Sequence, residues 1–585
     1  YDALLPNRNF TKDQEFREQL SVDWFICDGL RLKGQMAIVK GETSGEIYKS
    51  PFSAEFLKTT YNSESRVQEY LPIAERGYLS MTDGASFSYD GNVTLNYNTL
   101  VNEKHIIYAG AGLEVTQNDN NSHGFIMTGF PDDRYSDPAF AIQYKKETKP
   151  SSSESKSRAI GFFANGNYSY DDRYFADVSV RIDGSSKFGA DKKYAPFWSA
   201  GAGWNVHNEK FFKHTKISML KLRYSYGVTG NQEFSAYQAK TMFQFNTDRL
   251  YNSGISAALM GYGNPDLEWQ NQYQSNYGFD FGYAKDRIRL QFNYYQKKTE
   301  GMLTSVSVAP SLGLPSNTFT SNLGKIQNKG VEVNLNAVLI RDQGKDFEWS
   351  VMLQAAHNKN KIMEISTALK NINEKNNQDK TTPAAVYEEG ESMSAIKAVP
   401  SLGIDPTTGQ ELFMKKDGTI TYTWDATDKV ICGDSEPKVF GNVGTNLYWK
   451  GWNLNMVFKY DLGADYYNST LAERVEGANP RYNADRRVLN NRWKEPGQHA
   501  LYKNIKEYTT TYISSRFVQK ENTLQLTSLS LSYDLNREWI RKFGLNTMRL
   551  SFYMNDVFRA STVKNERGLD YPFQRSFVFG LNIGF

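Results

Sequence analysis

The C-terminal segment alternates between large apolar residues and small or polar ones. The large residues occupy every second position: Phe577, Phe579, Leu581, Ile583 and Phe585. A period of two places the two sets on opposite faces of a β-strand. A strand of a soluble sandwich shows the same alternation, but a chain that ends on an aromatic residue at the tip of such a strand is typical of outer-membrane barrels.

The same alternation recurs along the chain in about 17 segments, each long enough to cross a bilayer as a tilted strand. The predicted strands are 17–27, 31–40, 84–99, 104–117, 158–170, 173–183, 196–206, 218–228, 272–284, 287–300, 329–340, 347–358, 438–449, 452–462, 522–535, 546–558 and 573–585. A slip of the alternation near Thr527 and Ser528 predicts a β-bulge. Residues 394–404 are a candidate for a further hairpin.

Short and long connections alternate between these strands. Short turns are predicted near Asp28, Leu100, Asp171, Ala284, Arg341 and Lys450. Long polar loops are predicted at 41–83, 118–157, 229–271, 301–328, 359–437 and 463–521. An outer-membrane barrel has this rhythm of short periplasmic turns and long extracellular loops. A sandwich has no reason to place every long loop at one end, so the sequence favours an all-β, antiparallel transmembrane barrel.

Strand parity extends this interpretation. If the last strand ends in the periplasm, the first enters from outside, and residues 1–16 belong to an extracellular loop. Barrels of this class have an even number of strands, and five more would give the 22-stranded barrel of transporters whose lumen holds a plug. No plug-like segment is visible, and the chain begins at Tyr1 without a signal-like stretch. We therefore expect residues 17–585 to be the C-terminal part of a barrel that is interrupted in an extracellular loop.

Composition agrees with this fold class and excludes others. The 585 residues are 39% hydrophobic and 14% aromatic, with 37 Tyr and 35 Phe, and no run of about 18 apolar residues predicts a membrane helix. The net charge is only +3, which argues against nucleic acid as a partner. Cys27 and Cys432 are predicted on opposite sides of the membrane, so we expect no disulfide between them.

Five motifs make the chain similar to the SusC/RagA family of TonB-dependent outer-membrane transporters. The motif residues are Arg181, Asp183, Gly184 and Ser185 in R-I-D-G-S-S-K-F-G, Gly230 and Asn231 in L-K-L-R-Y-S-Y-G-V-T-G-N-Q, Asn264, Pro265 and Trp269 in G-N-P-D-L-E-W, Asn328 and Gly330 in N-L-G-K-I-Q-N-K-G-V-E, and Asp405 in G-I-D-P-T-T-G. The resemblance covers most of residues 155–585, whereas residues 1–150 match loosely and the family's plug, TonB box and first strands are absent. The motif residues have the composition of turns, in which Gly relieves backbone strain and Asp, Asn or Ser caps backbone groups, so we interpret them as structural.

The resemblance implies active import of a large nutrient, an oligosaccharide or an oligopeptide, into a Gram-negative cell. It implies energy from the inner membrane through TonB, which would act on a plug supplied by a second polypeptide or a missing N-terminal segment. It also implies a SusD-like surface lipoprotein as a lid over the extracellular mouth. Outer-membrane lipid surrounds such a barrel.

Catalytic chemistry is not visible in the sequence. The six His residues show no metal-ligand spacing, and no G-x-S-x-G or P-loop motif is present, so we expect no enzyme activity, metal or cofactor. The oxygen-rich stretch of residues 117–121 has two interpretations, a Ca²⁺ site or a solvated loop.

Aromatic residues in the predicted outer loops are candidates for contact with substrate or lid. They are Tyr251, Tyr262, Tyr422, Trp424 and Trp493. Packing within the loops is the alternative role of each. Two other classes of function remain open, namely a passive pore or structural barrel and an outer-membrane enzyme. The family motifs argue against the pore, and the enzyme lacks a visible nucleophile and base.

Overall fold

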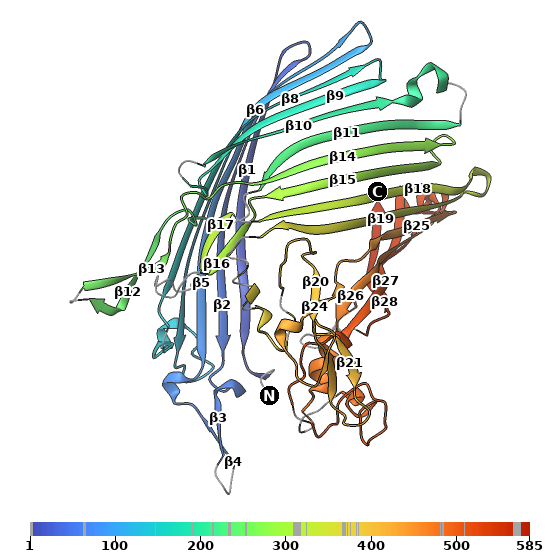
Figure 1. Ribbon diagram of the computed structural model, residues 1–585. Coiled ribbons are helices and arrows are strands. Elements are labelled where there is room, and N and C mark those ends of the chain that lie inside the picture. The colour runs from blue at the N-terminus through green and yellow to red at the C-terminus, as the bar shows by residue number, and fades with distance from the viewer. Residues whose placement is uncertain are drawn as a thin grey trace. The chain divides into compact units, whose positions relative to one another are not determined.

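Antiparallel β-strands dominate the computed structural model (Figure 1). It describes residues 4–61, 66–146, 148–189, 192–212, 216–231, 236–251, 254–307, 318–322, 324–365, 370, 373–374, 376–381, 383, 385–479, 481, 485–507, 509–564 and 575–585. The chain divides into two units. The first comprises residues 1–168, 178–198 and 232–269, and the second comprises residues 169–177, 199–231 and 270–585.

The long strands of the first unit follow one another in an antiparallel meander. Its strands are β1 (Arg8–Cys27), β2 (Leu30–Lys49), β5 (Tyr78–Val101), β6 (His105–Thr128), β7 (Gln143–Tyr144) and β8 (Ser151–Tyr170). β1 pairs with β2, β2 with β5, β5 with β6, and β6 with both β7 and β8. The hairpin of β9 (Tyr174–Ser185) and β10 (Tyr194–Asn205) contributes its residues from 178 to 198.

The second unit continues in the same way. Its long strands are β11 (Ile217–Asn231), β14 (Gln270–Tyr283), β15 (Ile288–Glu300), β18 (Lys325–Asp342), β19 (Phe347–Glu364), β25 (Val439–Trp449), β26 (Trp452–Tyr467), β27 (Val518–Asp534), β28 (Thr547–Ser561) and β29 (Phe577–Gly584). Each pairs with the next in this order. Figure 1 shows β14, β15, β18 and β19 side by side.

All 17 predicted strands therefore match strands of the structure, although several strands are longer than predicted. β5 and β6 each run for 24 residues. The predicted bulge is confirmed, because the register between β27 and β28 shifts between Leu526 and Ser528.

Three expectations about loops were wrong. Residues 8–16 are not part of a loop, because β1 begins at Arg8 and pairs with β2. Residues 117–121 lie inside β6, opposite residues 85–89 of β5, so they are not a solvated loop. Residues 394–404 form no hairpin of their own, because β20 (Ala395–Ala398) pairs with β24 (Val430–Asp434) and β21 (Ser401–Ile404) pairs with β22 (Glu411–Met414). In each case hydrogen bonds to a distant strand extend or redirect the segment, and local composition does not reveal such a partner.

The short connections are tight turns. Asp171 and Asp172 have φ angles of 53° and 52°, and Lys450 and Gly451 have φ angles of 48° and 88°. Positive φ at both central residues matches the right-handed twist of the flanking strands, and Asp and Gly tolerate this conformation.

The long connections contain strands of their own. These are β3 (Leu57–Tyr61) with β4 (Arg66–Tyr70), β12 (Met242–Tyr251) with β13 (Gly254–Gly261), β16 (Leu303–Ser307) with β17 (Thr318–Asn322), and β23 (Ile420–Thr421), which pairs with β22. The main helical turns are η10 (Thr470–Glu476), η11 (Arg486–Leu489), η12 (Ser515–Phe517) and α2 (Arg537–Ile540). Among the described residues no helix is long and apolar enough to cross a membrane.

In strand β9 the alternation of apolar and polar residues corresponds to two faces with different exposure. Val178, Val180 and Ile182 are each about half exposed on one face, at 52%, 50% and 49%. The side chains between them, such as Arg181 and Asp183, are half-buried on the other face. A half-exposed apolar face opposite a polar face is the pattern of a strand between lipid and an aqueous lumen. We call these faces the lipid face and the lumen face.

Candidate functional sites at the long-loop end

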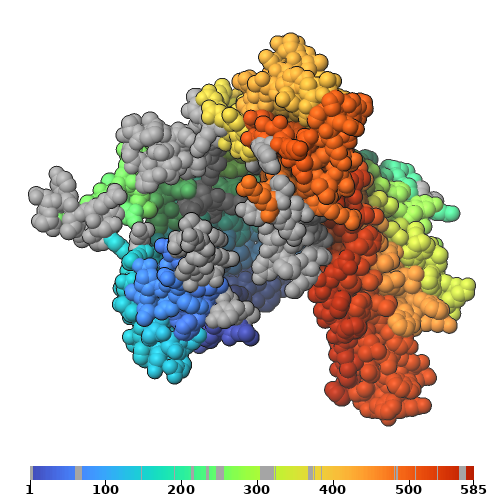
Figure 2. Space-filling model, turned by 90° about the horizontal axis from the view of Figure 1, so that it is seen from below, coloured from blue at the N-terminus to red at the C-terminus, as the bar shows by residue number. Residues whose placement is uncertain are grey.

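Two long loops of the second unit fold together into one body, which we call the loop body. It comprises described residues of 385–437 and 468–517. The parallel bridge between Val399 and Ser514 joins the two loops, and the backbone N–H of Ser401 donates to the Ser515 hydroxyl at 2.9 Å. Figure 2 shows these segments as one mass of orange atoms. Val399, Ile513 and Phe517 are almost completely buried there, so the two loops share an apolar core.

A buried ionic network lies at the centre of the loop body. Arg516 donates from Nη1 to Oε2 of Glu476 at 2.5 Å and from Nη2 to Oε1 of Glu476 at 2.8 Å. Its Nε and Nη2 also donate to Glu411, at 3.2 Å and 2.8 Å. Glu411 comes from the first loop and Glu476 from the second, and the side chain of Glu476 is 0% exposed. One guanidinium therefore ties the two loops together.

Two further cations complete the network. Nζ of Lys503 lies 3.9 Å from Oε1 of Glu476, and Arg492 donates to the carbonyl oxygens of Glu476 and Lys503 at 2.9 Å and 3.1 Å. Burial lowers the pKa of Lys503, and the negative charge of Glu476 opposes that shift. Burial also acts to lower the pKa of Arg516, but the hydrogen bonds and charges of Glu476 and Glu411 raise it above its usual range. Arg516 therefore keeps its charge, and the network is rigid because each group depends on its partners.

Three of the five predicted contact residues lie in the loop body. Trp424 donates its indole N–H to the Ile513 carbonyl at 2.9 Å and stacks on Tyr512, with ring centroids 5.1 Å apart. Trp493 donates to the Pro406 carbonyl at 2.8 Å. Trp424 and Trp493 therefore lie in the same loop body, and the indole of each is engaged in packing and in a hydrogen bond to a backbone carbonyl.

Tyr422 and Tyr262 are the more accessible candidates. Tyr422 is 48% exposed and donates its hydroxyl to Oδ2 of Asp405 at 2.6 Å. Tyr262 is 43% exposed in the first unit, directly after β13. Tyr251 ends β12, and its side chain lies outside the described residues.

In the first unit, two of the sequence motifs pack against each other. Phe188, from the R-I-D-G-S-S-K-F-G segment, stacks on Trp269 with ring centroids 4.4 Å apart, and the Trp269 indole donates to the Lys193 carbonyl at 3.4 Å. A Cβ on Gly189 would lie only 1.7 Å from the carbonyl oxygen of Pro265, so only glycine allows the two segments to approach. Oδ1 of Asn264 accepts a hydrogen bond from the Asp266 N–H at 3.0 Å, which closes the turn.

The remaining motif residues lie on or beside strands. Arg181 binds Asp183 at 2.5 Å and Glu114 at 2.8 Å across the lumen face. Gly184 and Ser185 are buried at the end of β9. Gly230 and Asn231 end β11 opposite Asn271 and Gln270.

In β18, Asn328 accepts hydrogen bonds from the amides of Asn358 and Asn360 at 3.2 Å and 2.8 Å. Gly330 leaves room for the Tyr295 hydroxyl, which would lie 2.4 Å from a Cβ at that position.

The remaining predicted residues are the apolar residues of the C-terminal strand and the two cysteines. Phe577, Phe579 and Leu581 of β29 are exposed by 59%, 79% and 57%, with Ile583 and the terminal Phe585 also exposed. Cys27 and Cys432 carry free thiols. In the described part of the chain, no cluster of three or more His, Cys, Asp or Glu residues is arranged to hold a metal ion.

Sequence reasoning missed the Arg516 network. Its members come from positions 411, 476, 492, 503 and 516, and no spacing rule links charged residues that far apart. The only signal available in the sequence was the prediction of two long loops at the same end of the barrel.

Comparison with known proteins agrees with the predicted resemblance. Residues 6–557 match the family described as TonB dependent receptor-like, beta-barrel. TonB-dependent receptor P3 of Formosa agariphila is 28% identical over 486 residues, which make up 75% of this chain and 46% of that protein. The TonB-dependent receptor SusC of Bacteroides thetaiotaomicron is 23% identical over 535 residues, which make up 85% of this chain and 51% of that protein. The chain therefore spans about half the length of these curated relatives.

The fold is shared with solved structures. The RagAB peptide importer in its closed-closed state superposes with a TM-score of 0.84 at 21% identity, over 99% of this chain and 63% of the other. The long antiparallel strands, the exposed apolar face and the family match agree with one another. The chain belongs to the TonB-dependent receptor-like β-barrels of the bacterial outer membrane.

Proposed function

We propose that the protein containing this chain imports a large nutrient, an oligosaccharide or an oligopeptide, across the outer membrane. In this proposal TonB supplies the energy through a plug, and a SusD-like surface lipoprotein covers the extracellular mouth. The plug and the strands that complete a 22-stranded barrel come from a polypeptide segment outside this sequence. The names of the relatives support the proposal, since one is a TonB-dependent receptor named SusC and another is a peptide importer.

The observation that carries the proposal is the loop body, in which two long loops share a buried ionic network and one apolar core. Loops of a simple pore need only leave the mouth open, whereas a lid needs a surface with a fixed shape. The Arg516 network and the core around Val399 and Ile513 hold two loops in one arrangement. Binding residues concentrate on loops that a rigid scaffold positions.

Within the loop body, Tyr422 is the candidate for contact with substrate or lid. Its ring is about half exposed, and the bond to Asp405 fixes its direction. Trp424 and Trp493 contribute by holding the surface in place. Tyr262 and Tyr251 remain candidates on the first unit.

The test uses the complete protein in its native host. Uptake of labelled oligosaccharides and oligopeptides is measured in cells with and without functional TonB, and lipoproteins that co-purify with the receptor are identified. We expect TonB-dependent uptake of one of the two classes and a lipoprotein in stoichiometric amount. Conductance of the purified protein in planar bilayers without TonB, together with TonB-independent uptake, would support the passive pore instead.

A matched pair of variants tests the surface itself. Tyr422→Ala removes an exposed aromatic ring, whereas Ile420→Ala removes a side chain from β23 that is 62% exposed and makes no hydrogen bond. We expect Tyr422→Ala to weaken lipoprotein or substrate binding and Ile420→Ala to leave both unchanged. Equal binding by both variants would remove Tyr422 from the proposal.

A further inference from the structure

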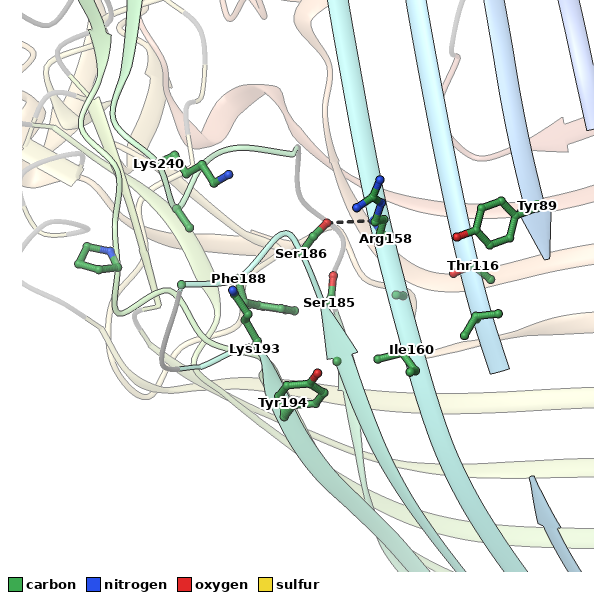
Figure 3. Close-up of a pocket in the computed structure, with 16 residues that line it drawn as sticks. Tyr89, Thr116, Arg158, Ile160, Ser185, Ser186, Phe188, Lys193, Tyr194 and Lys240 are labelled. Carbon is green, nitrogen blue, oxygen red and sulfur yellow. Dashed lines mark hydrogen bonds between the residues drawn. The ribbon is translucent and has the colours of Figure 1, made fainter. Parts of the chain in front are cut away.

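A cavity of about 540 Å³ lies in the first unit, where the two packed motifs meet the strands. Its lining comes from two parts of this unit, the strand residues Tyr89, Arg158, Ile160 and Tyr194 and, from the connection after β11, Lys240 and Pro265. Figure 3 shows Lys240 reaching from its loop toward the strand that carries Arg158, with Ser186 between them in the view.

The larger strand side chains that line the cavity are in phase with the lipid face. Ile160 lies two residues from Phe162 on β8, and Tyr194 lies four residues from Trp198 on β10, so each pair shares a face. Phe162 is 48% exposed, Trp198 46% and Tyr194 64%. A Cβ on Gly184, which alternates in phase with Ile182, would lie 2.4 Å from the Tyr194 ring. The strand wall of the cavity therefore continues the surface that contacts lipid acyl chains.

The cavity also lies at one level of the membrane. Val115 comes ten residues after the start of β6 at His105, Gly184 comes ten residues after the start of β9, and Tyr194 precedes the end of β10 by eleven residues. These distances are counted from the short-turn end, and a strand crosses the hydrocarbon core in about 9–11 residues. The cavity is therefore at the outer edge of the apolar band, where the headgroups of the outer leaflet begin.

The lining is cationic. Arg158, Lys193 and Lys240 line the cavity, and no Asp or Glu does. Two basic side chains near the cavity, by contrast, are paired with carboxylates. Lys156 binds Asp119 at 2.7 Å, and Lys192 lies 3.6 Å from Glu268. No described carboxylate lies within ion-pair distance of the three lining cations.

Arg158 is also oriented. Its Nε donates to Oε1 of Gln117 at 2.7 Å, and the amide of Gln117 donates in turn to Asp119 at 2.8 Å. This relay fixes the plane of the guanidinium through Nε, and within the described ranges of the chain no side chain or carbonyl accepts from its two terminal amino groups. A guanidinium presented in this way suits the bidentate recognition of a phosphate.

We propose that this cavity binds the phosphate-bearing headgroup of an outer-leaflet membrane lipid. The phosphate lies among Arg158, Lys193 and Lys240, the sugar or glycerol part of the headgroup lies against Tyr89 and Tyr194, and the acyl chains continue along Phe162, Val180 and Ile182. Basic pockets at the edge of a membrane-spanning region bind anionic lipids by this combination of charge and apolar contact. The proposal concerns the outside of the barrel and does not depend on what the protein imports.

The test measures lipid binding by the complete protein in detergent, with native mass spectrometry. The probes are lipid A that carries phosphate, the same lipid after enzymatic removal of phosphate, and inorganic phosphate. We expect bound phosphorylated lipid, at least tenfold weaker binding of the dephosphorylated lipid, and no displacement by millimolar inorganic phosphate. Equal binding of the two lipids overturns the proposal, and displacement by inorganic phosphate shows a free-anion site and also overturns it.

Variants then locate the site. The triple variant Arg158→Gln, Lys193→Gln and Lys240→Gln is expected to lose at least tenfold in affinity for the phosphorylated lipid. Lys187→Gln is the matched control, because Lys187 belongs to the same motif and does not line the cavity. Migration of unheated samples in gels verifies that both variants are folded. A folded triple variant that binds the lipid like the control would disprove the site.

Discussion

Arg516 and Glu476 form a two-point ion pair in which the Glu476 side chain is fully buried and that of Arg516 is 11% exposed. Because Arg516 also binds Glu411 of the other loop, this pair lies at the junction of two loops that the β25–β26 hairpin separates in the chain. A buried charge without its partner is far less stable than a completed pair, so the arrangement makes the two loops dependent on each other.

Arg516→Met is expected to destabilise the loop body by about 3–5 kcal/mol, because two buried carboxylates lose their cation. Thermolysin cleavage within residues 468–517 should become much faster, while the barrel strands stay protected. The control is Arg549→Met, which breaks an exposed pair with Asp534 whose side chains are 55% and 43% exposed. Such a pair contributes about 0–1 kcal/mol. Equal cleavage rates in the two variants would show that the network is not what holds the loops.

Gly189→Ala is expected to destabilise the junction of the two motifs by about 1–3 kcal/mol, since its methyl group would overlap the Pro265 carbonyl and force the backbone apart. The stacking of Phe188 on Trp269 should loosen, which hydrogen exchange at residues 186–189 and 264–269 would detect. Gly261→Ala is the control, because a Cβ there meets nothing within 4 Å. Unchanged exchange in Gly189→Ala would contradict the close approach.

Val180→Arg tests the assignment of the lipid face. Val180 is 50% exposed and lies six residues into β9, near the middle of the apolar band. Arginine on the lipid face at this depth costs about 2–4 kcal/mol, so less protein should reach the folded, heat-modifiable form. Ser179→Arg places the same side chain on the lumen face and should assemble better. The reverse order would mean that the faces are assigned wrongly.

The turn at Asp405 is expected to loosen in acid. Hydrogen bonds from the Tyr422 hydroxyl and the Thr407 N–H hold the pKa of Asp405 below its usual value. A carboxyl with a lowered folded pKa stabilises the fold above its unfolded pKa of about 3.9, and that contribution disappears as the pH falls through the folded pKa.

Pepsin digestion across this range measures the effect. Cleavage within residues 400–415 should increase below about pH 4 in the unaltered protein. Asp405→Asn has no charge to lose, so its cleavage in this segment should not change across the same range. Parallel pH profiles of the two proteins would exclude Asp405 as the cause.

Local patterns were sufficient to predict the strands. The alternation in residues 173–183 and 573–585 indicated which side chains lie on the lipid face, and the structure has Val180, Ile182 and Phe579 exposed there. This works because the side chains of a strand alternate strictly and each face meets one solvent, lipid or water, so burial can be inferred without knowing the neighbouring strands. Turn residues such as Asp171 and Asp172 were equally informative, because positive φ restricts residue choice locally.

Local sequence patterns did not predict which distant segments contact each other. Residues 117–121 resemble a loop in composition, yet they extend β6 because residues 85–89 of β5 offer a row of backbone partners. The meeting of Glu411, Glu476 and Arg516, and that of Arg158 with Lys193 and Lys240, depend on how long connections fold back. Periodicity encodes the environment of each residue, whereas the choice of partner depends on chain entropy and packing over hundreds of residues, which appear only in three dimensions.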